Sequence, residues 1–293
     1  IGHKAICDIP IDSGQIIHRL CFSRIYRCLP ACNPAPTNGP IFREHHVART
    51  LDYNAVWADT TDMLRQHREA IIAIAGLLIL VPNWASAFFI GQPDIEGVKT
   101  ISDIIAAQGE HFRANWMILL PFALISFFGA IAVLTCLLRP EQERIGDALL
   151  FAAKLFPVYL IVSILTGILT SLGAFAFLIG LFYIAGRLLP VLPVVVAETD
   201  KGIGIWGSIA RGWDLTRGLG WKCFLLFLII MLVAYISMGV IDVVVGILCT
   251  AVAGPEGLPL VQTLVSALTG SVLGVIILAL EAAVYRHLQR QDA

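Results

Sequence analysis

Six apolar runs, each of roughly 20 residues, constrain this sequence more than any other feature, because a helix of that length crosses the hydrocarbon core of a bilayer. A helix also satisfies its own backbone hydrogen bonds, as a lipid environment requires. The chain is 58% hydrophobic and only 14% charged, whereas soluble domains carry about 25% charged residues. We therefore predict an all-α, polytopic membrane protein. Its six expected transmembrane helices lie at about 71–91, 115–138, 156–173, 175–197, 221–248 and 258–285.

Basic residues are distributed unevenly between the segments that connect these runs. If the N-terminus is cytoplasmic, the inside segments hold twelve lysines and arginines, and the outside segments hold only Lys99 and Arg113. Cytoplasmic loops carry an excess of positive charge. The distribution therefore predicts that both termini are cytoplasmic. The net charge of −1 gives no overall field that would attract nucleic acid, so we expect no nucleic-acid partner.

Residues 1–46 differ in character from the rest of the chain. They show neither a helical nor a strand period, and they contain four of the seven cysteines, Cys7, Cys21, Cys28 and Cys32. We interpret 1–46 as a non-native or disordered leader and 47–290 as a single six-helix membrane domain. The alternative is a zinc site formed by these cysteines and nearby histidines. Their spacing lacks the paired CxxC arrangement of common zinc sites, which disfavours that alternative.

Three segments have the pattern of an amphipathic helix that leads directly into an odd-numbered span. They are 50–70, 140–156 and the stretch GIGIWGSIARGWDL beginning at Gly202. The pattern predicts three repeats, each a cytoplasmic amphipathic helix followed by a transmembrane hairpin. The alternative is that these are ordinary cytoplasmic loops of a membrane protein.

The third of these segments carries the most distinctive residues. Four apolar side chains share one predicted helix face, namely Ile205, Trp206, Ile209 and Trp213. The other side is expected to hold Ser208, Arg211 and Asp214. Tryptophan favours the membrane interface, and basic residues there attract anionic headgroups. The candidate interfacial headgroup site comprises Arg211, Trp213, Thr216, Arg217, Trp221 and Lys222.

This region also resembles a known family. The sequence has an acidic residue that ends a span, Glu198, and then a Trp-x-Leu-Thr-x-Gly-x-x-Trp run from Trp213 to Trp221. It is similar to the membrane domain family named after glycerophosphoryl diester phosphodiesterase and to related bacterial inner-membrane proteins, over about 47–290. The resemblance implies a multi-pass protein of the bacterial inner membrane. It does not imply hydrolase activity, because no soluble segment here is long enough for the separate catalytic domain.

Three ionisable residues lie within the apolar runs and form the candidate intramembrane polar site: Arg187, Asp242 and Glu281. Charge inside a bilayer is costly and raises a functional hypothesis, here a polar cavity for a substrate or lipid headgroup. Either carboxylate is placed to pair with Arg187 by depth. The structural alternative is that Arg187 caps helix ends broken by Pro190 and Pro193, while the carboxylates reach the interfaces.

Small residues recur at every fourth position of the sixth run, at Ser266, Gly270 and Gly274. Such spacing allows two helices to approach closely. We predict helix packing within the bundle, with a homo-oligomer interface as the alternative.

Catalytic signatures are missing from the sequence. The GxGxxG match at Gly202, Gly204 and Gly207 follows a span rather than a strand, which disfavours a nucleotide site. We expect neither enzymatic activity nor a cofactor. The predicted role is a membrane module that binds or organises lipids or a protein partner; the alternative is a transporter or permeation subunit with a polar site at Arg187.

Overall fold

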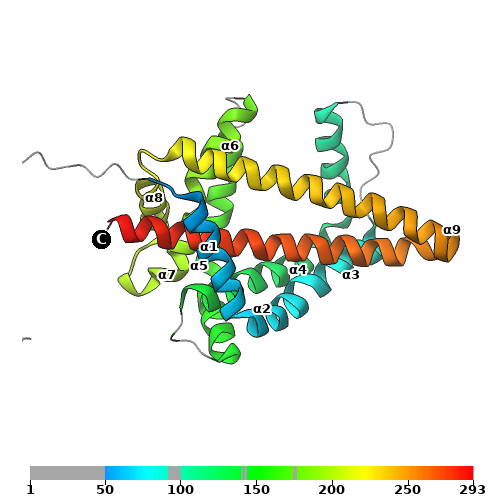
Figure 1. Cartoon of the computed structure of the whole chain (residues 1–293), viewed down its shortest axis with the longest axis horizontal. Helices are drawn as coiled ribbons and strands as arrows, with labels where there is room; N and C mark the ends of the chain where they lie inside the picture. Colours follow the sequence, from blue (N-terminus) through cyan, green and yellow to red (C-terminus); the bar gives the residue numbers. More distant parts are fainter. Residues whose placement is uncertain (1–49, 92–99, 140, 142–143, 174–176, 293) are drawn as a thin grey trace, which may run out of the picture. The chain divides into compact units, whose positions relative to one another are not determined.

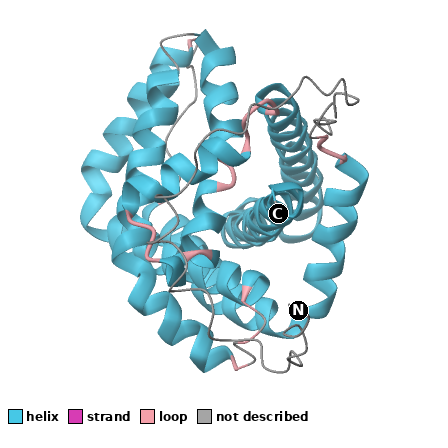
Figure 2. Ribbon diagram, turned by 90° about the vertical axis from the view of Figure 1, so that its left-hand side faces the viewer, coloured by secondary structure: helices cyan, strands magenta, loops and turns pink. Residues whose placement is uncertain are grey.

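The computed structural model describes residues 50–91, 100–139, 141, 144–173 and 177–292, with the side chains at 101, 177–178, 249–250 and 252–259 left undescribed. The leader interpreted at 1–46, with its four cysteines, lies outside the described residues. The described part is helical and contains no strand (Figures 1 and 2). This agrees with the all-α class that the sequence predicts.

Six helical stretches are long and apolar enough to cross a membrane, as the apolar runs predict. They are Arg68–Ile90, Ser102–Leu138, Ile145–Gly173, Ile179–Ala197, Gly220–Leu248 and Leu260–Asp292. The chain is therefore consistent with a multi-pass membrane protein. Several stretches begin earlier than the sequence predicts, because the helices continue beyond the purely apolar part of each run.

The first half of the described chain begins with a capped helix. Helix α1 (Tyr53–Gln66) begins where the Asp52 carboxylate accepts hydrogen bonds from the backbone N–H groups of Asn54 and Ala55. The first span then consists of α2 (Arg68–Ala75), the π-helical turn η1 (Gly76–Leu80) and α3 (Val81–Ile90). Helix α4 (Ile101–Leu138) is the second span and begins with a capping box between Thr100 and Asp103.

The second predicted amphipathic segment does not form a helix of its own. Helix α5 (Ile145–Gly173) runs without interruption from that segment through the third span, with Pro157 inside it. No break separates an interfacial part from a spanning part. Separate helices precede the first and fifth spans only, so the three-repeat organisation is not confirmed.

The fourth span is broken, as its prolines suggest. Helix α6 (Phe177–Leu188) ends before Pro190, and the short helix α7 (Val191–Ala197) continues the chain. Pro190 has no N–H group, so it cannot continue the hydrogen-bond ladder of α6. The turn η3 (Thr199–Lys201) then leads to α8 (Ile205–Leu215). Gly218 has a φ of 79°, which allows the tight turn from α8 into the next helix.

The final helix, α9 (Gly220–Asp292), folds back on itself. Ser266 donates a hydrogen bond of 2.8 Å to Asp242, although 24 residues of straight helix would extend about 36 Å. The two arms, Gly220–Leu248 and Leu260–Asp292, therefore form the fifth and sixth spans and lie side by side in Figure 1. Ser266 and Gly270 face the first arm, since a Cβ on Gly270 would lie 3.9 Å from Met238 Cε. Gly274 has no such neighbour within 4 Å.

Candidate functional site: an apolar groove beside Arg187

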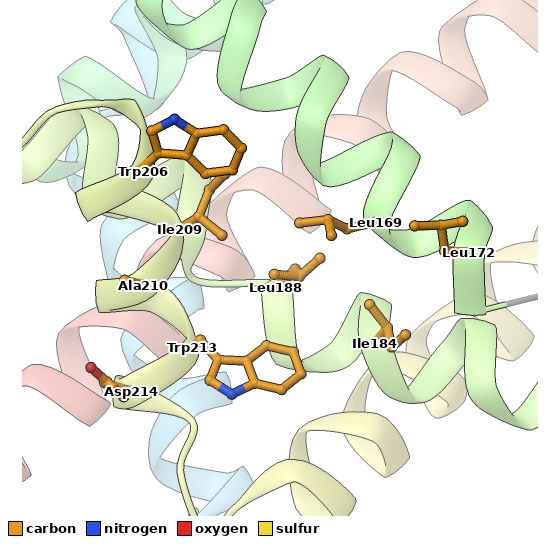
Figure 3. Close-up of a pocket in the computed structure, with 9 residues that line it drawn as sticks. All are labelled: Leu169, Leu172, Ile184, Leu188, Trp206, Ile209, Ala210, Trp213 and Asp214. Atoms are coloured by element: carbon orange, nitrogen blue, oxygen red, sulfur yellow. The ribbon is translucent and has the colours of Figure 1, made fainter.

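A groove of about 550 Å³ lies between α8 on one side and α5 and α6 on the other (Figure 3). The wall formed by α5 and α6 is entirely aliphatic and consists of Leu169, Leu172, Ile184 and Leu188. The α8 wall contributes Trp206, Ile209, Ala210, Trp213 and Asp214. Asp214 is the only charged residue among these nine, so the groove offers an apolar surface with a single acidic group at one end.

Small side chains determine how α8 is seated. Ser208, Gly212 and Leu215 are buried. Gly212 packs so closely on Val191 of α7 that a Cβ there would overlap that side chain. Ser208 lies on the side of α8 away from the tryptophans, as the sequence predicts, and this side is buried: the Ser208 hydroxyl donates to the carbonyl of Gly204 over 3.2 Å. The backbones of α7 and α8 approach so closely that only small residues, Ser208 and Gly212, fit on the side of α8 that faces the protein. Trp206 and Trp213 therefore lie on the other side, where they line the groove.

Arg187 lies at the broken point of the fourth span and holds the C-terminal end of α8. Its Nη2 donates to the backbone carbonyl of Trp213 over 3.0 Å, and its Nε donates to the Thr216 hydroxyl over 3.4 Å. The guanidinium also stacks on the Trp213 ring, 3.9 Å from the ring centroid. The last carbonyls of a helix lack partners within that helix and carry partial negative charge. Arg187 supplies both the donor and the positive charge at this position.

The two carboxylates that were expected near Arg187 from the sequence, those of Asp242 and Glu281, do not contact it in the described part of the chain. Asp242 accepts the Ser266 hydroxyl, as noted above. Glu281 has a buried Oε2 without a hydrogen-bond partner in the described part of the chain. Among the described residues, neither forms an ion pair with Arg187. The arginine instead binds the C-terminal end of α8. This corresponds to the structural alternative in which Arg187 caps a helix end, although the capped helix is α8 and not the broken fourth span.

The residues of the candidate headgroup site, Arg211 apart, separate into three groups. Trp213 and Thr216 contact Arg187, as described. Trp221 is 65% exposed and packs at a tilt against Tyr183 of α6, with ring centroids 5.4 Å apart. Arg217 and Lys222 are exposed on the turn and the start of α9.

Arg211 turns away from this groove. Its Nη1 lies 2.7 Å from Asp292 and its Nε lies 3.6 Å from Glu198. Burial disfavours the charged guanidinium, but the hydrogen bonds and charges of these two carboxylates outweigh that effect and raise the Arg211 pKa. Arg211 therefore belongs to a second, ionic cluster.

Glu198 is the centre of that cluster, and it is only 2% exposed. It accepts a hydrogen bond of 3.0 Å from the Tyr285 hydroxyl and forms an ion pair of 3.2 Å with Lys201. Nearby, Arg139 donates to the carbonyl of Val196 over 2.9 Å and to Asp200 over 2.7 Å. The sequence shows Glu198 only as an acid that ends a span, and Arg139 only as one orientation charge. The sequence feature that could have indicated this ionic cluster is the presence of an acidic residue at the end of one span and a basic residue at the end of another.

No group of three or more His, Cys, Asp or Glu residues suited to a metal ion occurs in the described ranges. Among the cysteines whose side chains the structure describes, Cys136 and Cys223 are buried and free. In comparisons with known proteins, no protein-family model, curated protein or solved structure matches this chain.

Proposed function

We propose that this chain is a non-enzymatic, membrane-embedded module that binds a lipid, with the acyl chain of that lipid in the groove between α8 and the α5–α6 pair. The observation that carries the proposal is the apolar lining of the groove on two spans and an adjoining helix. A hydrocarbon chain is the material that surrounds such spans in a bilayer. Filling the groove with it leaves no void against the exposed Leu172 and Trp206 side chains.

The proposal also covers the membrane in which the protein lies and the family to which it is related. Twelve of the fourteen basic residues that were assigned to a side lie on one face of the predicted topology, which supports cytoplasmic termini in a bacterial inner membrane. The Trp213-to-Trp221 run supports kinship with the membrane domain family named after glycerophosphoryl diester phosphodiesterase. In this topology α8 lies at the cytoplasmic interface, where its tryptophans meet the headgroups and the aliphatic wall extends into the membrane.

The proposal is tested with a substitution that narrows the groove and leaves the buried core unchanged. Ala210 lines the groove and is exposed, so Ala210→Trp adds volume inside it. Ala106→Trp is the matched control, because Ala106 is exposed on α4 and does not line the groove. Both variants and the parent chain are purified in mild detergent, and retained lipid is counted by native mass spectrometry.

We expect the parent and Ala106→Trp to retain a lipid that Ala210→Trp loses. A parent chain that retains no lipid, or an Ala210→Trp variant that retains as much as the parent, contradicts the proposal.

A further inference from the structure

Arg187 is a cation without an acidic partner in the described part of the chain. Its two hydrogen-bond acceptors, the Trp213 carbonyl and the Thr216 hydroxyl, are both neutral. Asp242 accepts the Ser266 hydroxyl, and Glu198 is bound by Lys201 and Tyr285. Asp214 lines the groove next to Trp213 but forms no ion pair with Arg187 among the described residues. A guanidinium does not lose its charge in a protein. Because Arg187 is bound to the end of α8, which the proposed topology puts at the membrane interface, its charge favours an anionic partner there.

The same guanidinium adjoins the groove. It stacks on the Trp213 ring, and that ring lines the groove. Leu188, the next residue in the chain, lines it as well. The Nη1 atom of Arg187 has no hydrogen-bond partner among the described residues, whereas Nε and Nη2 are held by α8. Arg187 is thus held in position by α8, and its Nη1 group remains free to donate to a ligand.

We infer that the lipid in the groove is an anionic phospholipid whose phosphate is the counter-ion of Arg187. This inference rests on the proposed function, and it names the headgroup class. Guanidinium groups bind phosphate oxygens through charge-assisted hydrogen bonds, which are stronger than neutral ones. A zwitterionic phospholipid also offers a phosphate, but its own ammonium offsets the negative charge and leaves Arg187 uncompensated. The headgroup therefore carries net negative charge.

The test measures which lipid lies against Trp213. In the full chain, the other five tryptophans (Trp57, Trp84, Trp116, Trp206 and Trp221) are replaced by phenylalanine. The protein is placed in phosphatidylcholine nanodiscs that contain a small, varied fraction of brominated-chain phosphatidylglycerol or brominated-chain phosphatidylcholine. Bromine quenches tryptophan fluorescence on contact. A chain retaining only Trp116, which is exposed on α4, reports the bulk lipid.

We expect brominated phosphatidylglycerol to associate with the Trp213 site about fivefold more strongly than its phosphatidylcholine counterpart, as one added charge interaction near the surface implies. Arg187→Gln should reduce that preference to near unity, and Arg187→Lys should largely keep it. Arg68→Gln, the same change at an exposed arginine away from the groove, should leave the preference intact.

The outcomes separate the two proposals. Stronger quenching at Trp213 than at Trp116, but equal for both headgroups, overturns the anionic inference and leaves the lipid groove standing. Quenching at Trp213 no greater than at Trp116 overturns the groove itself. If circular dichroism shows that Arg187→Gln does not fold, the headgroup comparison in the parent chain decides, because equal association of the two lipids contradicts the inference without any variant.

Discussion

Tyr285 donates its hydroxyl hydrogen to the buried carboxylate of Glu198 over 3.0 Å, and so joins two spans whose residues lie 87 positions apart. Tyr285 is itself 2% exposed. The contact connects the end of α9 to the segment between α7 and α8, and the packing of α8 on α7 in turn forms one wall of the groove. A polar interaction outside the groove therefore supports the element that defines it.

Removal of this hydroxyl should destabilise the fold. We expect Tyr285→Phe to lower the free energy of unfolding by about 1–3 kcal/mol, because a buried acceptor loses its partner. Tyr53→Phe is the matched control, since the Tyr53 hydroxyl donates to the carbonyl of Lys222 at an exposed position. Its effect should stay within about 0.5 kcal/mol. Chemical denaturation in mixed micelles measures both, and equal losses in the two variants would contradict the role assigned to Glu198.

Arg139 should matter more than an exposed arginine with a similar ion pair. Its side chain is 8% exposed, bonds Val196 and Asp200, and stacks on Phe151 at 4.3 Å. We expect Arg139→Gln to cost about 2–3 kcal/mol, from an unpaired carbonyl and a lost cation–π contact.

The comparison for Arg139 is Arg290→Gln, which breaks an ion pair of 3.0 Å with Asp59. The Arg290 side chain is 58% exposed, so this loss should not exceed about 1 kcal/mol. The same unfolding assay ranks the two variants. If Arg139→Gln lowers the free energy of unfolding no more than Arg290→Gln does, Arg139 contributes only to the orientation of the protein in the membrane.

Cysteine labelling tests the predicted topology. In a chain whose native cysteines are replaced by serine, Arg217→Cys should react with a membrane-impermeant thiol reagent only after the cells are permeabilised. Ser102→Cys, at the start of α4, should react in intact cells. Both positions are exposed in the structure, so access within the protein does not limit the reaction. The reverse pattern would invert the orientation and place α8 at the outer interface.

The number of spans was predictable because hydropathy and length depend on local composition. The six expected runs correspond one by one to the six apolar helical stretches. The break in the fourth span was also predicted, from Pro190 and Pro193, because proline has no backbone N–H group. A single proline does not always break a helix, since Pro157 lies inside the uninterrupted α5. The interfacial helix predicted at 140–156 is not confirmed: its polar start indicates such a helix, but no residue there ends the helix before the span.

The partners of the charged residues were not predictable from local pattern. Arg187 binds a backbone carbonyl and a threonine 26 and 29 residues away, and a carbonyl has no sequence signature. The outward position of Trp206 and Trp213 depends on Gly212 fitting against Val191, a contact between two helices. Periodicity groups residues into faces, but the tertiary packing decides which face is buried.

The crossing of α6 and the first arm of α9 gives a final prediction. A Cβ on Gly186 would lie 2.7 Å from the backbone nitrogen of Phe224, which is closer than real contacts allow. Backbone cannot move aside as the end of a flexible side chain can. Gly186→Ala should therefore separate the two helices and lower the free energy of unfolding by about 1–3 kcal/mol. Because Arg187 follows Gly186, the shift should also weaken retention of lipid in the groove.

Gly239→Ala is the control for this effect, since a Cβ at Gly239 meets nothing within 4 Å. It lies in the same arm of α9, and alanine favours helix by about 1 kcal/mol over glycine, so its stability should be unchanged or slightly increased. Thermal unfolding in detergent and native mass spectrometry report the two consequences separately. If Gly186→Ala is as stable as Gly239→Ala, α6 and α9 do not make this close crossing, and the position of Arg187 beside the groove loses its structural basis.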